Sequence, residues 1–253
     1  MYIKKHMFIV FGLVLNFVCR PVGLSAHWDI SELNSNTQKF NHMVLTNPKF
    51  KAAETKVFKY VKNSWCSEDK AKLIMELIAV TRPAICVEIG AFMGASTVPM
   101  LSSLRYLKHG HAYVVDAWSN QDAVEGLESS DPNTIWWSGL DMNQIYTCFM
   151  NTIKTHFLSS VCTVLKMPSQ LAVSKIPQID FLHLDGNFSE EGALRDTELY
   201  LPKVKQGGYI LVSNVFITIN GKVSKMKALW PLFDTCDIIS EIDNSNVLLF
   251  KKK

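Results

Sequence analysis

The chain has 253 residues, a length that suits one large α/β domain, and its 48% hydrophobic and 19% charged residues exclude a disordered protein. Three of its 26 basic residues lie in the first 26 positions, which contain no acid, so the remaining 23 basic residues balance the 23 acidic ones. The concentrated positive charge of a nucleic-acid-binding protein is therefore missing, and no nucleic-acid partner is expected.

Residues 1–26 have the order of a secretory signal: a basic start, an apolar run over residues 7–18, and the small residues Ser25 and Ala26 before a polar stretch. The apolar run is shorter than the roughly 20 residues that span a bilayer, which favours a signal peptide over a membrane anchor. Membrane association through residues 7–18 and a buried first helix are the alternatives. Residues 27–253 are then expected to form a single domain.

The cysteines favour reduced thiols. Five follow the leader, an odd number, and they contain no CxxC pair and no spacing typical of a zinc site. They are Cys66, Cys86, Cys148, Cys162 and Cys236. A disulfide-stapled extracellular fold is therefore not expected.

Helices and strands alternate along the rest of the chain. Helical spacing of apolar residues predicts helices over 49–62 and 68–80, the second with Ser67 as N-cap and an end at Arg82-Pro83. A strand at 85–89, a helix at 96–108 and a strand at 112–115 form a βαβ unit. Further strands are predicted at 162–165, 179–184, 209–212 and 246–250. This order predicts a Rossmann-like, doubly wound, mostly parallel sheet, with the last strand as the candidate for an antiparallel edge.

Residues 119–144 show no clear period and are interpreted as an inserted loop region over one end of the sheet. Such an insertion is typical of a segment that selects the substrate.

The first strand runs directly into a glycine turn. Gly90 and Gly94 would let the backbone approach a ligand beyond the strand end, and the helix opening near Ser96 would point free N–H groups at it. No phosphate-binding GxxxxGK[ST] is present, and Phe92 replaces the second glycine of a dinucleotide-binding GxGxxG. Asp116 ends the next strand, where a carboxylate can accept hydrogen bonds from both ribose hydroxyls. The pattern predicts a nucleoside ligand without a long phosphate tail.

Here the chain resembles the class I S-adenosylmethionine-dependent methyltransferases, and among them the small-molecule O-methyltransferase branch. The resemblance extends over residues 68–215. It is carried by four motifs in the family's order: Glu88-x-Gly90 with Gly94, Asp116-x-Trp118, the run 179–186 ending in Asp185-Gly186, and the run 201–210 with Gly207-Gly208.

The resemblance implies roles for the matching residues. The turn from Gly90 to Gly94 would surround the methionine part of the cofactor, with Asp116 on the ribose and Trp118 and Ser169 beside the adenine. Asp185 would face the sulfonium or the acceptor, and His183 lies on the same face of its strand. Candidate cofactor-binding residues are Glu88, Gly90, Ala91, Phe92, Gly94, Ser96, Asp116, Trp118, Ser169 and Asp185; candidate catalytic residues are Asp185 and His183.

Each of these residues also has a purely structural interpretation. The two glycines could allow close packing, Asp116 could cap the next helix, and Trp118 is as well explained by core packing as by a cofactor contact. His183 is favoured as a buried, hydrogen-bonded side chain within an apolar strand.

The family branch often uses a divalent metal such as Mg²⁺ to lower the pKa of the acceptor, held by two carboxylates and an amide. Asp185 and Asn214 match one carboxylate and the amide, but Ser213 replaces the second carboxylate. Phe188 stands where the branch's Asp-Gly-x-His motif has its histidine. Activity that survives a chelator is therefore expected.

The function expected from the resemblance is methyl transfer from S-adenosylmethionine to an oxygen of a small molecule. The resemblance also suggests a homodimer. The main alternative is a non-catalytic protein that retains the fold and is exported or tethered to a membrane, because the leader would separate an enzyme from its cytosolic donor. A nicotinamide-dependent oxidoreductase is a third interpretation, which the missing GxGxxG disfavours.

Overall fold

The computed structural model describes residues 30–33, 42–219, 222–243 and 246–253. The predicted leader, residues 1–26, lies outside these ranges. The described chain opens with two short 3₁₀ segments, η1 (Ile30–Leu33) and η2 (His42–Thr46), and both bury a leucine in the core. No helix in the described ranges is both long and apolar enough to cross a membrane.

Helices α2 (Pro48–Val61) and α3 (Glu68–Thr81) form where the apolar periodicity predicts them. The side chain of Ser67 accepts a hydrogen bond from the Lys70 backbone N–H, which confirms it as the N-cap of α3. Arg82 adopts the left-handed conformation and ends α3 before Pro83.

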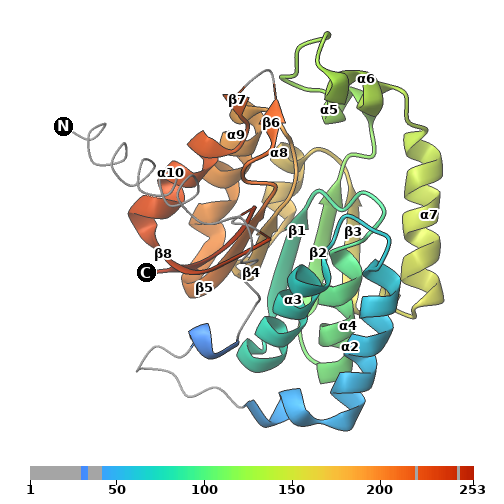
Figure 1. Ribbon diagram of the computed structural model, residues 1–253, viewed down its shortest axis with the longest axis vertical. Coiled ribbons are helices and arrows are strands. Elements are labelled where there is room, and N and C mark those ends of the chain that lie inside the picture. The colour runs from blue at the N-terminus through green and yellow to red at the C-terminus, as the bar shows by residue number, and fades with distance from the viewer. Residues whose placement is uncertain (1–29, 34–41, 220–221, 244–245) are drawn as a thin grey trace, which may run out of the picture.

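A seven-stranded sheet forms the centre of the molecule, in the order β3-β2-β1-β4-β5-β9-β8 (Figure 1). The first five strands in space are parallel: β3 (Cys162–Lys166), β2 (His111–Asp116), β1 (Ile85–Ile89), β4 (Ile179–Leu184) and β5 (Val204–Ser213). Strands β9 (Val247–Lys252) and β8 (Cys236–Ile242) complete it as an antiparallel pair, and β9 is antiparallel to β5. The fold is the expected Rossmann-like, doubly wound, mostly parallel sheet, and the expected antiparallel last strand is confirmed.

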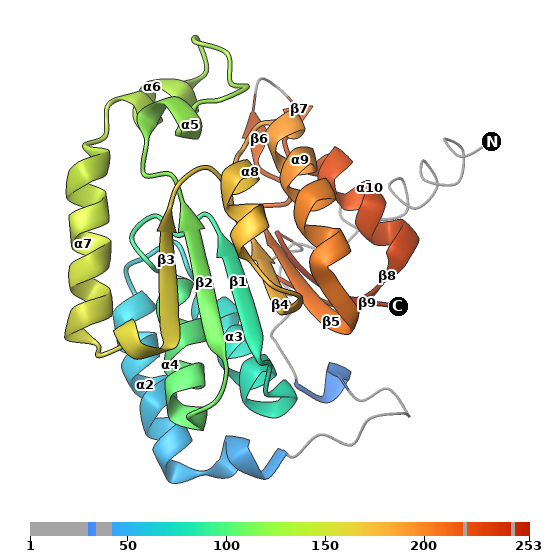
Figure 2. The ribbon, with the colours of Figure 1, turned by 180° about the vertical axis from the view of Figure 1, so that it is seen from behind.

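Helices cover both faces of the sheet, and alternate residues of each strand point to opposite faces. Cys86 of β1 packs toward α2, α3, α4 (Thr97–Leu107) and α7 (Met142–Thr155), whereas Val87 and Ile89 pack toward α9 (Glu190–Tyr200) and α10 (Met226–Thr235). Figure 2 shows α8 (Ser169–Ala172) and α9 on the face opposite to α3 and α4. Smaller elements are η3 (Ser159–Val161), η4 (Val173–Lys175), η5 (Leu201–Lys203) and the hairpin β6 (Thr218–Ile219) and β7 (Lys222–Val223).

The structure differs from the predicted elements in two places. The region 119–144 contains two short helices, α5 (Asn120–Ala123) and α6 (Pro132–Ser138), and the start of α7, so it is not a plain loop. Strand β8 was not predicted, because its alternating buried and exposed residues include Asp237, Ser240 and Glu241, which dilute the apolar signal of an edge strand.

Candidate active site

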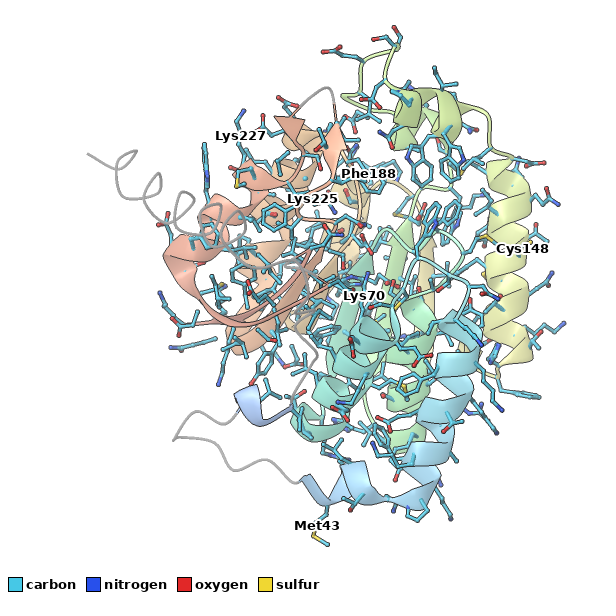
Figure 3. All side chains as sticks on the ribbon, viewed as in Figure 1. Met43, Lys70, Cys148, Phe188, Lys225 and Lys227 are labelled. Carbon is cyan, nitrogen blue, oxygen red and sulfur yellow. The ribbon has the colours of Figure 1, made fainter. Side chains whose placement is uncertain are left out.

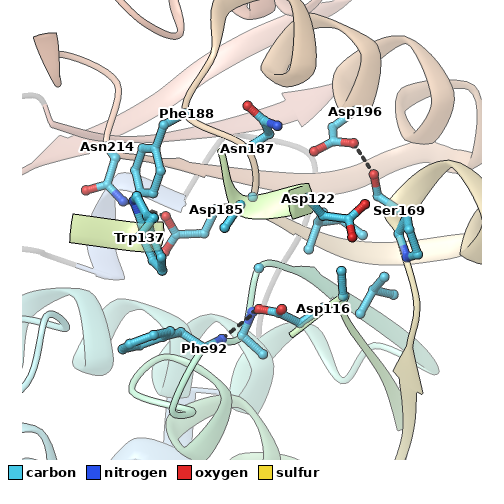
Figure 4. A pocket seen from close by; sticks show the side chains of 18 of the residues that line it. Phe92, Asp116, Asp122, Trp137, Ser169, Asp185, Asn187, Phe188, Asp196 and Asn214 are labelled. Atoms are coloured by element: carbon cyan, nitrogen blue, oxygen red, sulfur yellow. Dashed lines mark hydrogen bonds between the residues drawn. The ribbon is translucent and has the colours of Figure 1, made fainter. Parts of the chain in front are cut away.

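A cavity opens at the carboxyl ends of β1, β2 and β4, where the strand order reverses between β1 and β4, the usual ligand position in an open α/β sheet. Figure 4 shows two groups of side chains around it. Asp116, Asp122, Ser169 and Asp196 lie toward one end, and Asp185, Asn214, Trp137 and Phe188 toward the other. The cavity thus has a polar end suited to a nucleoside and an aromatic end suited to an acceptor.

The glycine turn lines the cavity, but its glycines serve packing. Gly90 has φ +87°, and a Cβ added there would stand 2.4 Å from the carbonyl oxygen of Asp185. Gly94 has φ +89°, and its Cβ would meet the ring of Phe149 at 3.1 Å. These contacts support the interpretation of close packing for both glycines. The turn itself still presents Gly90, Ala91 and Phe92 to the cavity.

Asp116 holds the turn in place. One of its oxygens, Oδ2, accepts hydrogen bonds from the backbone N–H groups of Ala91 and Phe92 at 3.0 and 2.9 Å, and Oδ1 accepts one from Trp118 at 2.7 Å. Burial raises the pKa of this carboxyl, and the three N–H groups partly offset the rise. Oδ2 already accepts two hydrogen bonds, but Oδ1 accepts only one and keeps a further lone pair. Asp116 also lines the cavity, so Oδ1 can still accept a hydroxyl.

Trp118, which was predicted to lie beside the adenine, packs behind the cavity wall. Its side chain is 4% exposed and is absent from the cavity wall among the described residues. The indole Nε1–H donates to the Phe92 carbonyl at 2.9 Å, and the ring packs on Tyr146 and Phe149 with centroids 4.9 Å away. Because the backbone at Trp118 has φ +43°, the indole turns behind the glycine turn and supports it.

Glu88 and His183, candidates for contacts with the cofactor and the acceptor, also lie outside the cavity wall among the described residues. For His183 this agrees with the interpretation of a buried, hydrogen-bonded side chain. Both are buried, and His183 Nδ1 lies 2.9 Å from Glu88 Oε1, while its Nε2 lies 2.8 Å from Ser213 Oγ. Glu88 also accepts hydrogen bonds from the hydroxyls of Ser96 and Thr97 at the start of α4. The network joins β1, β4, β5 and α4, so it holds the strand ends in register.

Ser169 and Asp196 form the polar end with Asp122. The Ser169 hydroxyl donates to Asp196, and its carbonyl accepts from the Tyr200 hydroxyl at 2.7 Å. Burial raises the pKa of Asp196. Ser169 lines the cavity as the sequence predicts, but its hydroxyl is already bound to this carboxylate.

Asp185 is the most heavily partnered carboxylate of the cavity. Lys70 Nζ donates to its Oδ2 at 2.9 Å and Asn214 Nδ2 to its Oδ1 at 2.6 Å, while Lys225 Nζ lies 4.0 Å from Oδ1. Burial favours a higher pKa for Asp185, but Lys70, His183 and Lys225 outweigh burial and lower it. The carboxyl is therefore ionised at neutral pH.

These partners do not fit a divalent metal. Both oxygens of Asp185 accept from protein donors, and Asn214 offers it an N–H group. A divalent ion about 4 Å from one ammonium would be repelled by roughly 8 kcal/mol at an effective dielectric constant of about 20. Among the described residues no group of three or more His, Cys, Asp or Glu side chains could hold a metal ion.

Aromatic side chains surround the acceptor end. The rings of Trp65 and Phe92 stack with centroids 5.0 Å apart and an interplanar angle of 9°. Trp137 meets Phe92 edge-on at 5.4 Å and lies 5.7 Å from Phe188. Trp65 is 66% exposed, an unusual state for so large an apolar side chain. The cluster provides flat apolar surfaces at the mouth of the cavity.

The insertion over the cavity is tied to α9 by an ion pair. Arg195 donates to both carboxylate oxygens of Glu125, at 2.8 and 2.6 Å. Asn187, on the loop after β4, donates to the Glu125 carbonyl at 3.2 Å. All three residues line the cavity, so this clamp closes one side of it.

Several of these residues were missed in the sequence. They are Trp65, Lys70, Asp122, Glu125, Trp137, Arg195 and Asp196. Lys70 had a signal: it precedes Leu73, Ile74 and Leu77 at helical spacing, so it is a lysine on the apolar stripe of α3. The others sit on segments without a period or on polar helix faces, where the sequence does not distinguish a cavity from solvent.

Comparison with known families gives one match, to a family described as a methyltransferase domain, over residues 87–215, just over half of the chain. No curated protein matches the chain.

Three solved structures with the same fold share little sequence with this chain. The O-methyltransferase from Bacillus cereus in complex with SAH superposes with a TM-score of 0.54 at 12% identity, covering 83% of this chain and 94% of that one. The O-methyltransferase NovP gives a TM-score of 0.57 at 17% identity, with 77% and 80% covered. TomG from Streptomyces achromogenes, an O-methyltransferase in complex with SAM, gives 0.52 at 11%, with 83% and 92% covered. At these identities the likeness establishes the fold.

Proposed function

This chain belongs to the methyltransferase-domain family, with a class I S-adenosylmethionine-dependent fold, and from that premise we propose that it transfers a methyl group to an oxygen of a small molecule. The observation that carries the proposal is the cavity at the strand-order reversal, polar at one end and aromatic at the other, with Asp185 between. The solved structures from Bacillus cereus, NovP and TomG are O-methyltransferases, and two of them are complexes with SAM or SAH.

The described residues fit S-adenosylmethionine. Asp116 Oδ1 keeps a lone pair for one ribose hydroxyl, and Asp122 and Ser169 lie at the same end of the cavity. The turn from Gly90 to Phe92 offers its backbone to the amino-acid part. When bound, the cofactor supplies a methyl group on a sulfonium that is already activated for transfer. The chain's own contribution is then to align the acceptor oxygen with that methyl group and to exclude water.

The acceptor is proposed to carry a flat, apolar ring. Phe92, Trp137 and Phe188 line the cavity beside Asp185, and aromatic faces at these separations favour stacking on a planar group. A phenolic hydroxyl on such a ring would reach the polar group formed by Asp185, Lys70 and Asn214.

Two measurements on the full-length protein test this function. Titration calorimetry with S-adenosylmethionine should give a dissociation constant in the micromolar range, and absence of heat up to about 1 mM would reject cofactor binding. Methyl transfer from a labelled donor should then be screened over phenols, aliphatic alcohols, amines and thiols. Phenols are expected to be the preferred acceptors.

The same pair of measurements separates the enzyme from the non-catalytic alternative. A protein that retains only the fold would bind the cofactor or fail to, but would label none of the four acceptor classes. Trp137→Ala is expected to raise the KM of a phenolic acceptor severalfold and leave cofactor affinity unchanged, because the ring lies toward the acceptor end. Trp230→Ala, an exposed tryptophan on α10 outside the cavity wall, is the matched control.

A further inference from the structure

A buried lysine ammonium lies inside the cavity beside Asp185. The Lys70 side chain is 5% exposed, lines the cavity, and donates one hydrogen bond, to Asp185 Oδ2 at 2.9 Å. An ammonium has three N–H groups, so two remain beyond that bond. Figure 3 shows Lys70 near the centre of the molecule, far from the outer helix surfaces.

Lys225, the second buried lysine near Asp185, has other partners. Lys225 Nζ donates to the Ser213 carbonyl at 2.9 Å and lies over the ring of Phe188 at 5.5 Å. It is outside the wall of the cavity that Lys70 lines. Lys70 is therefore the ammonium with donors free to meet a ligand in this cavity.

We propose that the Lys70 ammonium is the resident cation of the site and binds the oxyanion of the acceptor in place of a divalent metal. The inference rests on the proposed function and names the residue that replaces the expected metal. Three observations support it: Asp185 and Asn214, the two residues that match a metal site, are bonded to one another; Ser213 stands where a second carboxylate is expected; and Lys70 supplies the positive charge.

The chemistry balances without a metal. The acceptor hydroxyl gives its proton to solvent water, and the oxyanion that results pairs with the remaining N–H groups of Lys70. A lone pair on this oxygen then forms the O–CH₃ bond as the S–CH₃ bond breaks, and that bonding pair stays on sulfur, which becomes a neutral thioether. Lys70 keeps its own proton throughout.

The surroundings keep Lys70 charged. Burial alone would lower the pKa of its ammonium, but Asp185, Cys66 and Glu88 together outweigh burial and raise it. The titratable groups around it are Asp185 and His183 on or next to β4, Glu88 on β1, Cys66 before α3 and Lys225 before α10. The two lysines and the two carboxylates balance in charge, so a bound oxyanion is held by direct hydrogen bonds from the Lys70 ammonium and not by a net positive charge of the site.

The ionisation of 4-nitrophenol tests the proposal, because its phenolate is yellow and can be followed in the cavity without turnover. With wild-type protein the midpoint of ionisation of the bound phenol should fall by about one pH unit or more, a tenfold preference for the phenolate. Lys70→Arg keeps the charge and should keep the shift. Lys70→Met should remove it, and Lys72→Met, a charge removed from the same helix outside the cavity, should not.

Cofactor binding provides the independent control. S-adenosylhomocysteine should bind the wild type and all three variants within about threefold by calorimetry. If neither the wild type nor any variant binds S-adenosylhomocysteine, the proposed function fails. The phenolate measurement still tests whether Lys70 binds the oxyanion. Turnover should be unchanged after EDTA treatment and after addition of Mg²⁺.

Three results would overturn the assignment: equal midpoints in wild type and Lys70→Met, activity lost to EDTA and restored by Mg²⁺, or no binding of 4-nitrophenolate to wild type at millimolar concentration. If Lys70→Met fails to fold, a comparison of two ligands on the wild-type protein tests the proposal instead. It must bind 4-nitrophenolate at least tenfold more tightly than 4-nitroanisole, a neutral molecule of similar shape.

Discussion

At the residue scale, Gly90 shows how a motif glycine can serve the sheet and the ligand at once. The residue directly follows β1, its N–H donates to the Val115 carbonyl at 2.9 Å, and a side chain there would press on the backbone of Asp185. The glycine therefore permits the close approach of β1 and β4 that brings Asp185 to the cavity.

Gly90→Ala is expected to destabilise the protein more than Gly207→Ala. Both glycines have positive φ, +87° and +76°, so each alanine costs about 1–2 kcal/mol in backbone conformation. Only Gly90 has neighbours within 4 Å of an added Cβ, and overpacking there should add about 1–3 kcal/mol. Urea unfolding measures both free energies. Equal losses for the two variants would contradict the proposed contact between β1 and β4.

The individual residues also show where prediction from sequence ends. The carboxylates Asp116 and Asp185 were located correctly at the cavity, because carboxyl ends of parallel strands meet at one edge. Trp118 follows the strand of Asp116, and His183 belongs to the strand before Asp185, but both side chains point away from the cavity. A positive φ turns the indole of Trp118, and Glu88 holds the imidazole of His183 inside the sheet. Which way a side chain turns after a strand depends on partners from distant segments, and these are not visible in sequence spacing.

At the element scale, the insertion between β2 and β3 is tied to α9 by an ion pair with two hydrogen bonds, between Arg195 and Glu125. Hydrogen bonds from Arg195 lower the pKa of Glu125 from its ordinary value of 4.5, and both side chains are partly exposed. A carboxyl with a lowered pKa in the folded state adds stability above its ordinary pKa and loses it as the pH falls through the lowered value. The clamp is therefore intact at pH 7 and is released as the pH falls through the lowered pKa of Glu125.

Glu125→Gln should loosen the insertion at pH 7 without unfolding the protein. An exposed pair contributes at most about 1 kcal/mol, so amide hydrogen exchange of residues 120–131 should quicken by up to about fivefold. Glu128→Gln, in the same exposed stretch and without an ion pair in the described structure, is the control. If Glu125→Gln and wild type exchange at the same rate at pH 7, the pair does not hold the insertion.

The insertion was only partly predictable. Its position over the sheet end follows from the long interval between two parallel strands, which was identified correctly. Its helices were not, because α5 and α6 are four and seven residues long and are fixed by caps at Ser119 and Asp131, with no buried residue of their own. Helices this short carry no periodic apolar stripe, so hydrophobic spacing cannot reveal them.

At the scale of the whole molecule, the cavity lies where the two halves of the sheet diverge. Strands β1 to β3 carry α4 and α7 on one face, while β4 and β5 carry α9 on the other. The doubly wound order was predictable because strands alternate with helices along the chain. Strand β8 was not predictable in this way, because it joins the sheet by antiparallel pairing with β9. A ligand at the divergence touches both halves and should stabilise the whole fold.

S-adenosylhomocysteine is accordingly expected to raise the melting temperature of the full-length protein. A ligand that binds only the folded state at one hundred times its dissociation constant contributes about 2.7 kcal/mol, and each kcal/mol shifts the melting temperature of a chain of this size by about 2–4 °C. The expected rise is therefore about 5–10 °C by scanning calorimetry. NAD is the matched control, because Phe92 occupies the place of the glycine that would admit a pyrophosphate. A larger shift with NAD than with S-adenosylhomocysteine would favour the oxidoreductase interpretation. No shift with either ligand would contradict the prediction that the polar end of the cavity binds a nucleoside.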